Sequence, residues 1–349
     1  MKITLHKVTL NKRFPLAISR GVRYNSENLF VRFEKDGIFG WGEAAPGKTE
    51  GAETISQVKQ SIEKFISEGI EGQSIQKLYD RSRQLDVPPC AYVGLDTAFW
   101  DWTAKKAGMP LYQMLGFSKP FRPTSITIGI NTPEVVKERV PLLLEGTTVK
   151  SLKIKLGSPE GLEADKSMFE QVVESTRKYD VKIRVDANGG WNLSDAKKMM
   201  PWLAERGVDY IEQPLKEGEE GYLKELFKNR ALPIYVDESC RYSEDIPSFA
   251  EHVDGVNMKL MKCGGITEAL RIIGTARAYK LKTMIGCMSE SSVSIAAAAS
   301  LTGGIDHIDL DSHYNLSPDP AMGAPLINGI TLPQEIPGHG AELKKEFYA

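Results

Sequence analysis

Apolar and polar positions alternate along much of the first 45 residues, and this pattern predicts antiparallel strands. Residues 28–33 form one alternating run, Asp36-Gly37 supplies a turn, and residues 38–43 form the returning run. An Asp-Gly pair between two such runs is typical of a β-hairpin. Helical spacing follows in three stretches, at residues 52–67, 75–84 and 91–106. The first third of the chain is therefore predicted to be a small α+β unit, followed by a linker at residues 120–123.

Beyond residue 124, short apolar runs alternate with stretches that suit amphipathic helices, which is the pattern of a parallel sheet. The predicted strands are residues 125–130, 151–156, 182–186, 209–212, 233–237, 255–259, 283–287 and 307–311. Eight parallel strands over about 190 residues predict a closed barrel. No helix is expected between the last strand and Pro318, so the predicted fold class is α/β, a TIM-like (β/α)7β barrel beside the α+β unit. Residues 320–349 are expected to return to the first unit.

Charged residues stand at the ends of five neighbouring strands that should otherwise be apolar. They are Lys155, Asp186, Glu212, Asp237 and Lys259. Their spacing of 22 to 31 residues is about the length of one strand-helix unit, so all five should lie at the carboxyl-terminal mouth of the barrel. In barrel enzymes this mouth carries the active site.

The chemistry of this group indicates a metal site between two bases. Three converging carboxylates, Asp186, Glu212 and Asp237, would repel one another, and a hard divalent cation such as Mg²⁺ or Mn²⁺ removes that repulsion. Lys155 and Lys259 should face each other across the metal, where neighbouring positive charges lower the pKa of a lysine. A metal that stabilises a substrate carboxylate, between two opposed bases, suits inversion of the α-carbon by proton removal and return.

The composition and charge of the chain argue against a nucleic-acid or membrane partner. The chain has 349 residues, a formal net charge of −2 and 26% charged residues. A nucleic-acid partner would require a basic excess, and no apolar run reaches the roughly 18–20 residues of a membrane span. Early charges at the N-terminus predict no secretory segment. Four scattered cysteines without a CxxC motif predict neither a zinc site nor disulfides, so we expect a cytoplasmic location.

The motifs at the strand ends resemble those of the enolase superfamily, in its muconate lactonising enzyme subgroup. They are Lys153-x-Lys155, Asp186-x-Asn188, Glu212-Gln213-Pro214, Asp237-Glu238-Ser239 and Asn257-x-Lys259. The resemblance implies a capping domain at residues 1–121, completed by the tail at about 320–349, over a barrel at residues 122–319.

The resemblance also implies one Mg²⁺ per subunit on the three carboxylates, with Mn²⁺ as a substitute. It also implies Lys155 and Lys259 as the catalytic pair, and Lys153 matches a lysine that assists at the substrate carboxylate. Lys262 lies off the matching position and is expected to form a salt bridge.

Strand eight adds a finer resemblance, to the dipeptide epimerases of this subgroup. Alternation places Asp309 and Asp311 on one side of the strand, where two carboxylates suit a cationic group. In dipeptide epimerases an Asp-x-Asp at this place holds the α-ammonium of the substrate, and residues 285–292 also resemble that family. The implied reaction is epimerisation of the C-terminal residue of an L,L-dipeptide through a metal-stabilised enediolate. L-Ala-L-Glu is a candidate substrate, and murein-peptide metabolism is a candidate setting.

Two capping loops, residues 18–25 and 46–54, are expected to select the substrate side chain. Arg20 and Arg23 in the first loop would bind an acidic side chain. Glutamates in the second loop would favour a cationic one, and a hydrophobic preference stays open. Thr127 on the first barrel strand is a further candidate for substrate contact.

Other functions remain open from the sequence. Within the subgroup these are N-succinylamino-acid racemase, o-succinylbenzoate synthase and cycloisomerase, whose substrates offer no free α-ammonium to Asp309 and Asp311. Outside it are a Schiff-base aldolase with Lys155 as nucleophile, and an inactive barrel that serves as a binding module. The aldolase does not explain the three carboxylates. A homo-oligomer is compatible with the resemblance.

Overall fold

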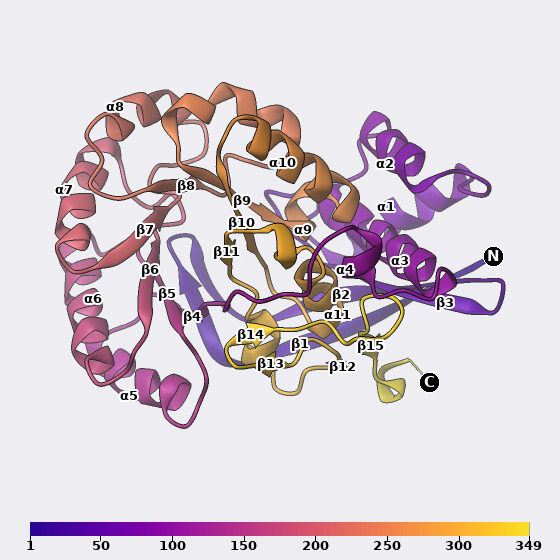
Figure 1. Ribbon diagram of the computed structural model, residues 1–349, viewed down its shortest axis with the longest axis horizontal. Coiled ribbons are helices and arrows are strands. Elements are labelled where there is room, and N and C mark those ends of the chain that lie inside the picture. The colour runs from indigo at the N-terminus through magenta and orange to yellow at the C-terminus, as the bar shows by residue number, and fades with distance from the viewer. Residues whose placement is uncertain (349) are drawn as a thin grey trace.

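A long antiparallel hairpin begins the fold, in a computed structural model that describes residues 1–348. Strand β1 (Lys2–Ile18) pairs with β2 (Gly21–Lys35), and β2 pairs with β3 (Ile38–Ala44). The predicted turn is confirmed, because Asp36 and Gly37 join β2 to β3 with positive φ angles of 56° and 73°. The turn between β1 and β2 lies at the other end of the sheet, and Figure 1 shows it reaching the barrel strands.

Helices cover one face of this sheet. They are α1 (Ile55–Ser67), α2 (Ile75–Gln84), α3 (Pro89–Lys106) and the short α4 (Leu111–Met114). Helix α3 is buried along most of its length. It lies so close to β3 that a Cβ atom at Gly42 would come within 2.0 Å of the carbonyl oxygen of Gly94. The Ala-rich, aromatic stretch predicted as a helix therefore forms the centre of the capping sheet's core.

Eight parallel strands form the second part, in sequential order. They are β4 (Ile126–Ile128), β5 (Ser151–Lys155), β6 (Lys182–Asp186), β7 (Val208–Glu212), β8 (Ile234–Val236), β9 (Gly255–Lys259), β10 (Lys282–Gly286) and β11 (His307–Ile308). The amide of Ser125 donates to the carbonyl oxygen of Ile308 at 3.1 Å, which joins the last strand to the first. The predicted barrel is confirmed.

The first and last barrel strands are shorter than the sequence indicated. Strand β4 has 3 residues, and β11 ends at Ile308, so Asp309 and Asp311 lie beyond it. Side chains replace the missing ladder bonds here. The amide of Leu310 donates to Thr124 Oγ1 at 2.7 Å, and the amide of Thr127 donates to Asp311 Oδ2 at 2.6 Å. Simple strand alternation therefore does not position the two aspartates.

Helices connect the barrel strands, and most of them form an outer arc (Figure 1). They are α5 (Pro133–Leu144), α6 (Leu162–Thr176), α7 (Leu193–Ala204), α8 (Leu223–Phe227), α9 (Leu260–Cys263), α10 (Ile266–Ala278) and α11 (Ser292–Ala299). The β8–β9 crossover instead uses two 3₁₀ turns, η2 (Ser243–Ser248) and η3 (Ala250–His252). Pro247 inside η2 lacks the N–H that a continuous α-helix requires. Within residues 1–348, none of the helices has the length and apolar character needed to cross a membrane.

The C-terminal tail lies against both parts. Strand β12 (Ala321–Met322) pairs with β15 (Glu342–Leu343), and β13 (Leu326–Ile327) pairs with β14 (Ile330–Thr331). A 3₁₀ turn, η6 (Lys345–Phe347), follows. His339 fastens the tail to the capping sheet and is completely buried. Its Nε2 donates to the carbonyl of Trp41 at 2.9 Å, while its amide donates to Asp101 Oδ1 at 2.8 Å. The domain boundaries at residues 121 and 319 stay predictions.

Glu43 at the end of β3 is completely buried against the start of α11 and makes stability depend on pH. Desolvation by burial raises the pKa of Glu43 to about 7, although hydrogen bonds from Ser291 and Asn28 act in the opposite direction. Because the unfolded chain loses this proton near its ordinary pKa of 4.5, folding stability should fall between pH 4.5 and about 7. The loss from this one group is about 3 kcal/mol.

The variant Glu43→Gln should flatten this part of the stability profile, measured by urea unfolding at pH 5 and pH 7.5. Glu27→Gln, on the half-exposed part of β2, is the matched control and should leave the profile unchanged. An equal slope in wild type and Glu43→Gln would show that Glu43 titrates normally.

Candidate active site

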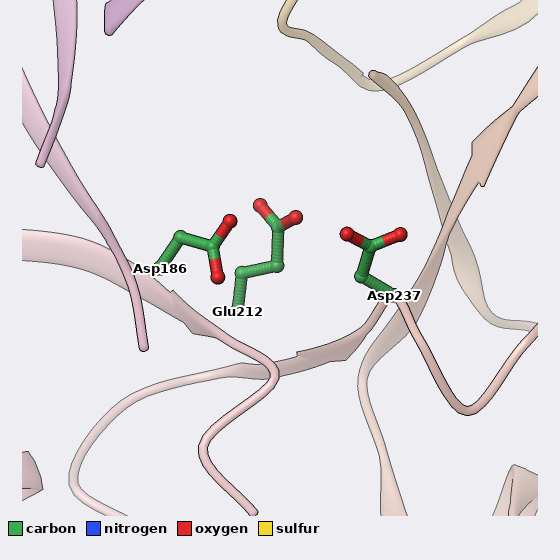
Figure 2. A group of neighbouring side chains, drawn as sticks. All are labelled: Asp186, Glu212 and Asp237. Atoms are coloured by element: carbon green, nitrogen blue, oxygen red, sulfur yellow. The ribbon is translucent and has the colours of Figure 1, made fainter. Parts of the chain in front are cut away.

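Three buried carboxylates meet at the carboxyl ends of three adjacent strands. Asp186 ends β6, Glu212 ends β7, and Asp237 directly follows β8. Each offers one oxygen within 4.8 Å of the other two, and none is more than 1% exposed. Figure 2 shows Glu212 between the two aspartates, with the three carboxylates turned toward a shared space. The structure therefore brings together the three residues predicted as metal ligands.

Lysines neutralise this cluster from both sides. Lys155 Nζ lies 2.6 Å from Asp186 Oδ2, and Lys259 Nζ lies 2.6 Å from Asp237 Oδ2. Asp186 and Asp237 flank Glu212 in Figure 2, so the ion pairs place Lys155 at one end of the row of carboxylates and Lys259 at the other. This is the arrangement that two bases acting on opposite faces of one carbon require.

Lys153 lies at the centre, fully buried on β5. Its ammonium is 3.1 Å from Asp186 Oδ2, 2.7 Å from Glu212 Oε2 and 2.7 Å from Asp309 Oδ2. These carboxylates raise the pKa of Lys153 well above its ordinary value, even though burial alone would lower it. Lys153 is therefore a permanent cation that links the carboxylate cluster to the aspartates of the last strand.

Protonation differs among the three carboxyl groups. Burial opposes ionisation of all three, but Lys155 and Lys153 lower the pKa of Asp186, and Lys259 and Lys262 lower that of Asp237. Burial and the neighbouring Asp186 charge raise the pKa of Glu212 to about 8. Ionisation of Glu212 beside the charged Asp186 is therefore unfavourable unless a further cation is present.

Lys259 is paired with a carboxylate of the cluster. Burial would lower its pKa, but the adjacent Asp237 carboxylate outweighs this effect and raises it above the ordinary value. The lowered pKa expected from the sequence depends on the positive charge of a divalent cation and stays a prediction.

The donor set fits a hard divalent cation. Glu212 Oε2 is buried and accepts no hydrogen bond from any described residue, although the Lys153 ammonium lies 2.7 Å away in an ion pair. An oxygen with an unused lone pair, facing two other carboxylates, is the arrangement expected of a Mg²⁺ ligand. The other oxygen, Oε1, accepts from Asn257 Nδ2 at 2.8 Å, which fixes the orientation of the carboxylate.

Asp309 and Asp311 lie at the mouth, beside the carboxylate cluster. Asp309 Oδ2 pairs with Lys153, and its Oδ1 is buried without a hydrogen-bond partner among the described residues. Burial and the nearby Asp309 charge raise the pKa of Asp311 to about 6. The amide of Thr127 donates to Asp311 Oδ2, and the assignment of Thr127 to substrate contact stays a prediction. The free oxygen of Asp309 beside the Asp311 carboxyl group suits a cationic ligand.

The two loop arginines differ in environment. Arg20 Nη2 donates to Glu238 Oε1 at 2.7 Å, and its Nη1 donates to the carbonyl of Asn188 at 2.8 Å. Arg23 is exposed on β2 and forms no ion pair with any residue in the described part of the chain. Their assignment to substrate binding stays a prediction.

Sequence reasoning gave no separate role to Asn257, which holds Glu212 as described above. Asn257 lies two residues before Lys259 on β9, so both side chains point into the barrel. This two-residue spacing could have predicted Asn257 as a residue of the site. Lys262 forms a salt bridge as expected, with its ammonium 2.7 Å from Asp237 Oδ1 and 2.9 Å from the carbonyl of Asn257. The strand-end pattern could not predict these partners, because Lys262 lies in the short helix α9 rather than on a strand.

Comparison with known proteins identifies the family. Residues 1–116 match the family described as "Mandelate racemase / muconate lactonizing enzyme, N-terminal domain", and residues 136–347 match "Enolase C-terminal domain-like". A hydrophobic dipeptide epimerase of Flavobacteria bacterium (strain MS024-2A) is 79% identical over 349 residues, covering 100% of both chains. A hydrophobic dipeptide epimerase of Roseobacter litoralis is 58% identical, covering 98% of this chain and 99% of the relative.

The chain belongs to the dipeptide epimerases of the enolase superfamily. The structure of the dipeptide epimerase from Enterococcus faecalis V583, complexed with Mg and the dipeptide L-Leu-L-Tyr, is similar to it with a TM-score of 0.89. The two sequences are 31% identical, and the superposition covers 97% of this chain and 98% of the Enterococcus faecalis chain. These comparisons confirm two predictions from the sequence, the resemblance to the dipeptide epimerases and the α/β barrel fold class.

Proposed function

We propose that this protein is a Mg²⁺-dependent isomerase that epimerises the C-terminal residue of hydrophobic L,L-dipeptides. The observation that carries the proposal is the position of Lys155 and Lys259 on opposite sides of the three buried carboxylates. The names of the two relatives at 79% and 58% identity support the choice of substrate class.

The carboxylate cluster of Asp186, Glu212 and Asp237 would hold the metal. A bound Mg²⁺ supplies positive charge next to the substrate carboxylate, where negative charge builds up when the α-proton leaves. Asn257 orients Glu212 for this task, and Lys262 holds Asp237.

Proton transfer falls to Lys155 and Lys259. One lysine removes the α-proton as a neutral amine, and the other donates a proton as an ammonium to the opposite face, so the configuration is inverted. Lys153 stays charged and stabilises the carboxylate of the substrate. Asp309 and Asp311 hold the α-ammonium at the other end of the dipeptide, where Asp309 Oδ1 offers a free acceptor.

Arg20 and Glu50 in the capping loops are already bound within the protein, which favours a hydrophobic substrate over the L-Ala-L-Glu candidate. Arg20 already neutralises Glu238, so its charge is not available to an acidic side chain. Glu50 is buried and accepts from Thr49 Oγ1 at 2.6 Å within its own loop, which removes it as a partner for a cationic side chain. The exposed Val22 and Tyr24 add apolar surface to the hairpin turn.

A screen of an L,L-dipeptide library in D₂O with Mg²⁺, read by mass spectrometry, tests the function. Hydrophobic dipeptides should gain one mass unit at the C-terminal α-carbon, and EDTA should prevent this. N-succinylated amino acids are the control substrates and should not exchange. Exchange in these compounds but in no dipeptide would overturn the proposal in favour of the acyl-amino-acid racemases.

Location and assembly are part of the same proposal. The four cysteines are free thiols, which supports a reducing, cytoplasmic location. A role in murein-peptide metabolism and a homo-oligomeric state remain predictions, to be checked by growth on murein peptides and by light scattering.

A further inference from the structure

The tip of the capping hairpin, residues 19–25, reaches the barrel beside the metal-binding cluster but buries little apolar surface. Val22 and Tyr24 are 51% and 66% exposed. The hairpin before the tip is bound to the segment that follows β4, where the amide of Ile130 donates to the carbonyl of Ala17 at 2.8 Å. Apolar packing therefore does not hold the tip at the mouth of the barrel.

Polar contacts from Ser19 and Arg20 hold the tip instead. Ser19 Oγ and Arg20 Nη1 both donate to the carbonyl oxygen of Asn188, at 2.9 and 2.8 Å. Arg20 Nη2 also binds Glu238 Oε1 at 2.7 Å. A half-exposed ion pair alone contributes little, but here one planar guanidinium binds two acceptors at once, which adds geometric specificity. Among the residues described, these are the hydrogen bonds that join the tip to the barrel.

Both acceptors belong to segments that carry metal-binding carboxylates. The amide of Asn188 donates to Asp186 Oδ1 at 2.8 Å, and Asn188 Nδ2 lies 3.3 Å from Glu238 Oε1. Glu238 is the residue after Asp237 in the chain. Arg20 thus connects the capping hairpin to the two aspartates that flank Glu212.

A cavity of about 360 Å³ lies directly outside this contact. Its lining includes Arg20, Asn188 and Glu238, but none of the three metal-binding carboxylates. The contact therefore forms part of the wall of that cavity. Its other lining residues include Gln213 and Lys216.

We infer that Arg20 is a positioning residue, a latch that holds the capping hairpin closed over the active site by binding Glu238 and Asn188. The inference rests on the proposed function and gives Arg20 a role different from binding an acidic substrate. Only molecules with the latch closed present a complete site, so the apparent affinity for any dipeptide scales with the closed fraction.

Steady-state kinetics of Arg20→Ala on several dipeptides provides the test. KM should rise about tenfold or more, by a similar factor for hydrophobic dipeptides and for L-Ala-L-Glu, while kcat stays within about threefold. Glu238→Gln should raise KM less, because the bond to Asn188 remains. Arg20→Ala with Glu238→Gln should be no worse than Arg20→Ala alone. Arg13→Ala, on the same hairpin, is the control and should behave as wild type.

Hydrogen exchange of the hairpin amides tests the latch without any substrate. Residues 19–25 should exchange faster in Arg20→Ala than in wild type, and Arg13→Ala should show no change. Unchanged exchange in Arg20→Ala, or a KM effect confined to glutamate-ended dipeptides, would overturn the latch. If wild type acted on no dipeptide, the proposed function would fail, but the exchange experiment would still decide whether the latch exists.

Discussion

Lys259→Ala and Lys155→Ala are each expected to lower epimerisation by about 10²–10⁴-fold, because inversion needs a base on one face and an acid on the other. Each lysine touches only one end of the carboxylate cluster, so neither can replace the other. The assay is the interconversion of L,L- and L,D-dipeptides, followed by polarimetry or chiral chromatography.

Deuterium incorporation separates the two roles. A variant with one lysine should still exchange the α-proton of the epimer whose proton points to the remaining lysine. Lys155→Ala and Lys259→Ala should therefore retain exchange in opposite epimers. Lys182→Ala removes an exposed lysine from the far end of β6 and is the control for general effects on the barrel. Full epimerisation by both single variants would refute the two-base mechanism.

Removal of the metal is the second change with a large expected effect. Chelation should abolish activity and Mg²⁺ should restore it, because a cation held by the three carboxylates would stabilise the negative charge that builds up on the substrate carboxylate when the α-proton leaves. Mg²⁺ should also raise the thermal unfolding temperature of wild type, since a ligand at a hundredfold excess over its Kd stabilises by about 2.7 kcal/mol.

Glu212→Gln should lose most of this thermal shift, because the substitution removes the charge of the central ligand while keeping its shape. Calorimetric titration with Mg²⁺ gives the affinity directly and does not depend on catalysis. Glu205→Gln, at an exposed position after α7, is the matched control and should keep the wild-type shift. Equal Mg²⁺ affinity in Glu212→Gln and wild type would show that the metal binds elsewhere.

The sequence was sufficient for the carboxylate cluster because strand ends in a parallel barrel all open on one mouth. Asp186, Glu212 and Asp237 each follow an apolar run, so the spacing of one strand-helix unit determined where they meet. The 3₁₀ crossover before β9 did not disturb this, since each ligand lies at the end of a strand or directly after it.

Contacts between distant segments could not be predicted in the same way. Arg20 looked like a free cation because Glu238 is 218 residues away in the chain, and no periodicity links a hairpin turn to a barrel loop. The ion pair of Lys259 with Asp237 could not be predicted for a related reason, since it depends on how the two side chains turn toward each other. Side-chain orientation of this kind comes from packing rather than from pattern.

The contact of His339 with Trp41 has a consequence for biosynthesis. The two residues are 298 positions apart, so the ribosome completes the first sheet long before its partner segment exists. Until then the carbonyl of Trp41 and the carboxylate of Asp101 lack the donors that His339 supplies. The nascent capping unit should thus stay open to proteases and chaperones while the barrel is translated, and it should mature only after the barrel.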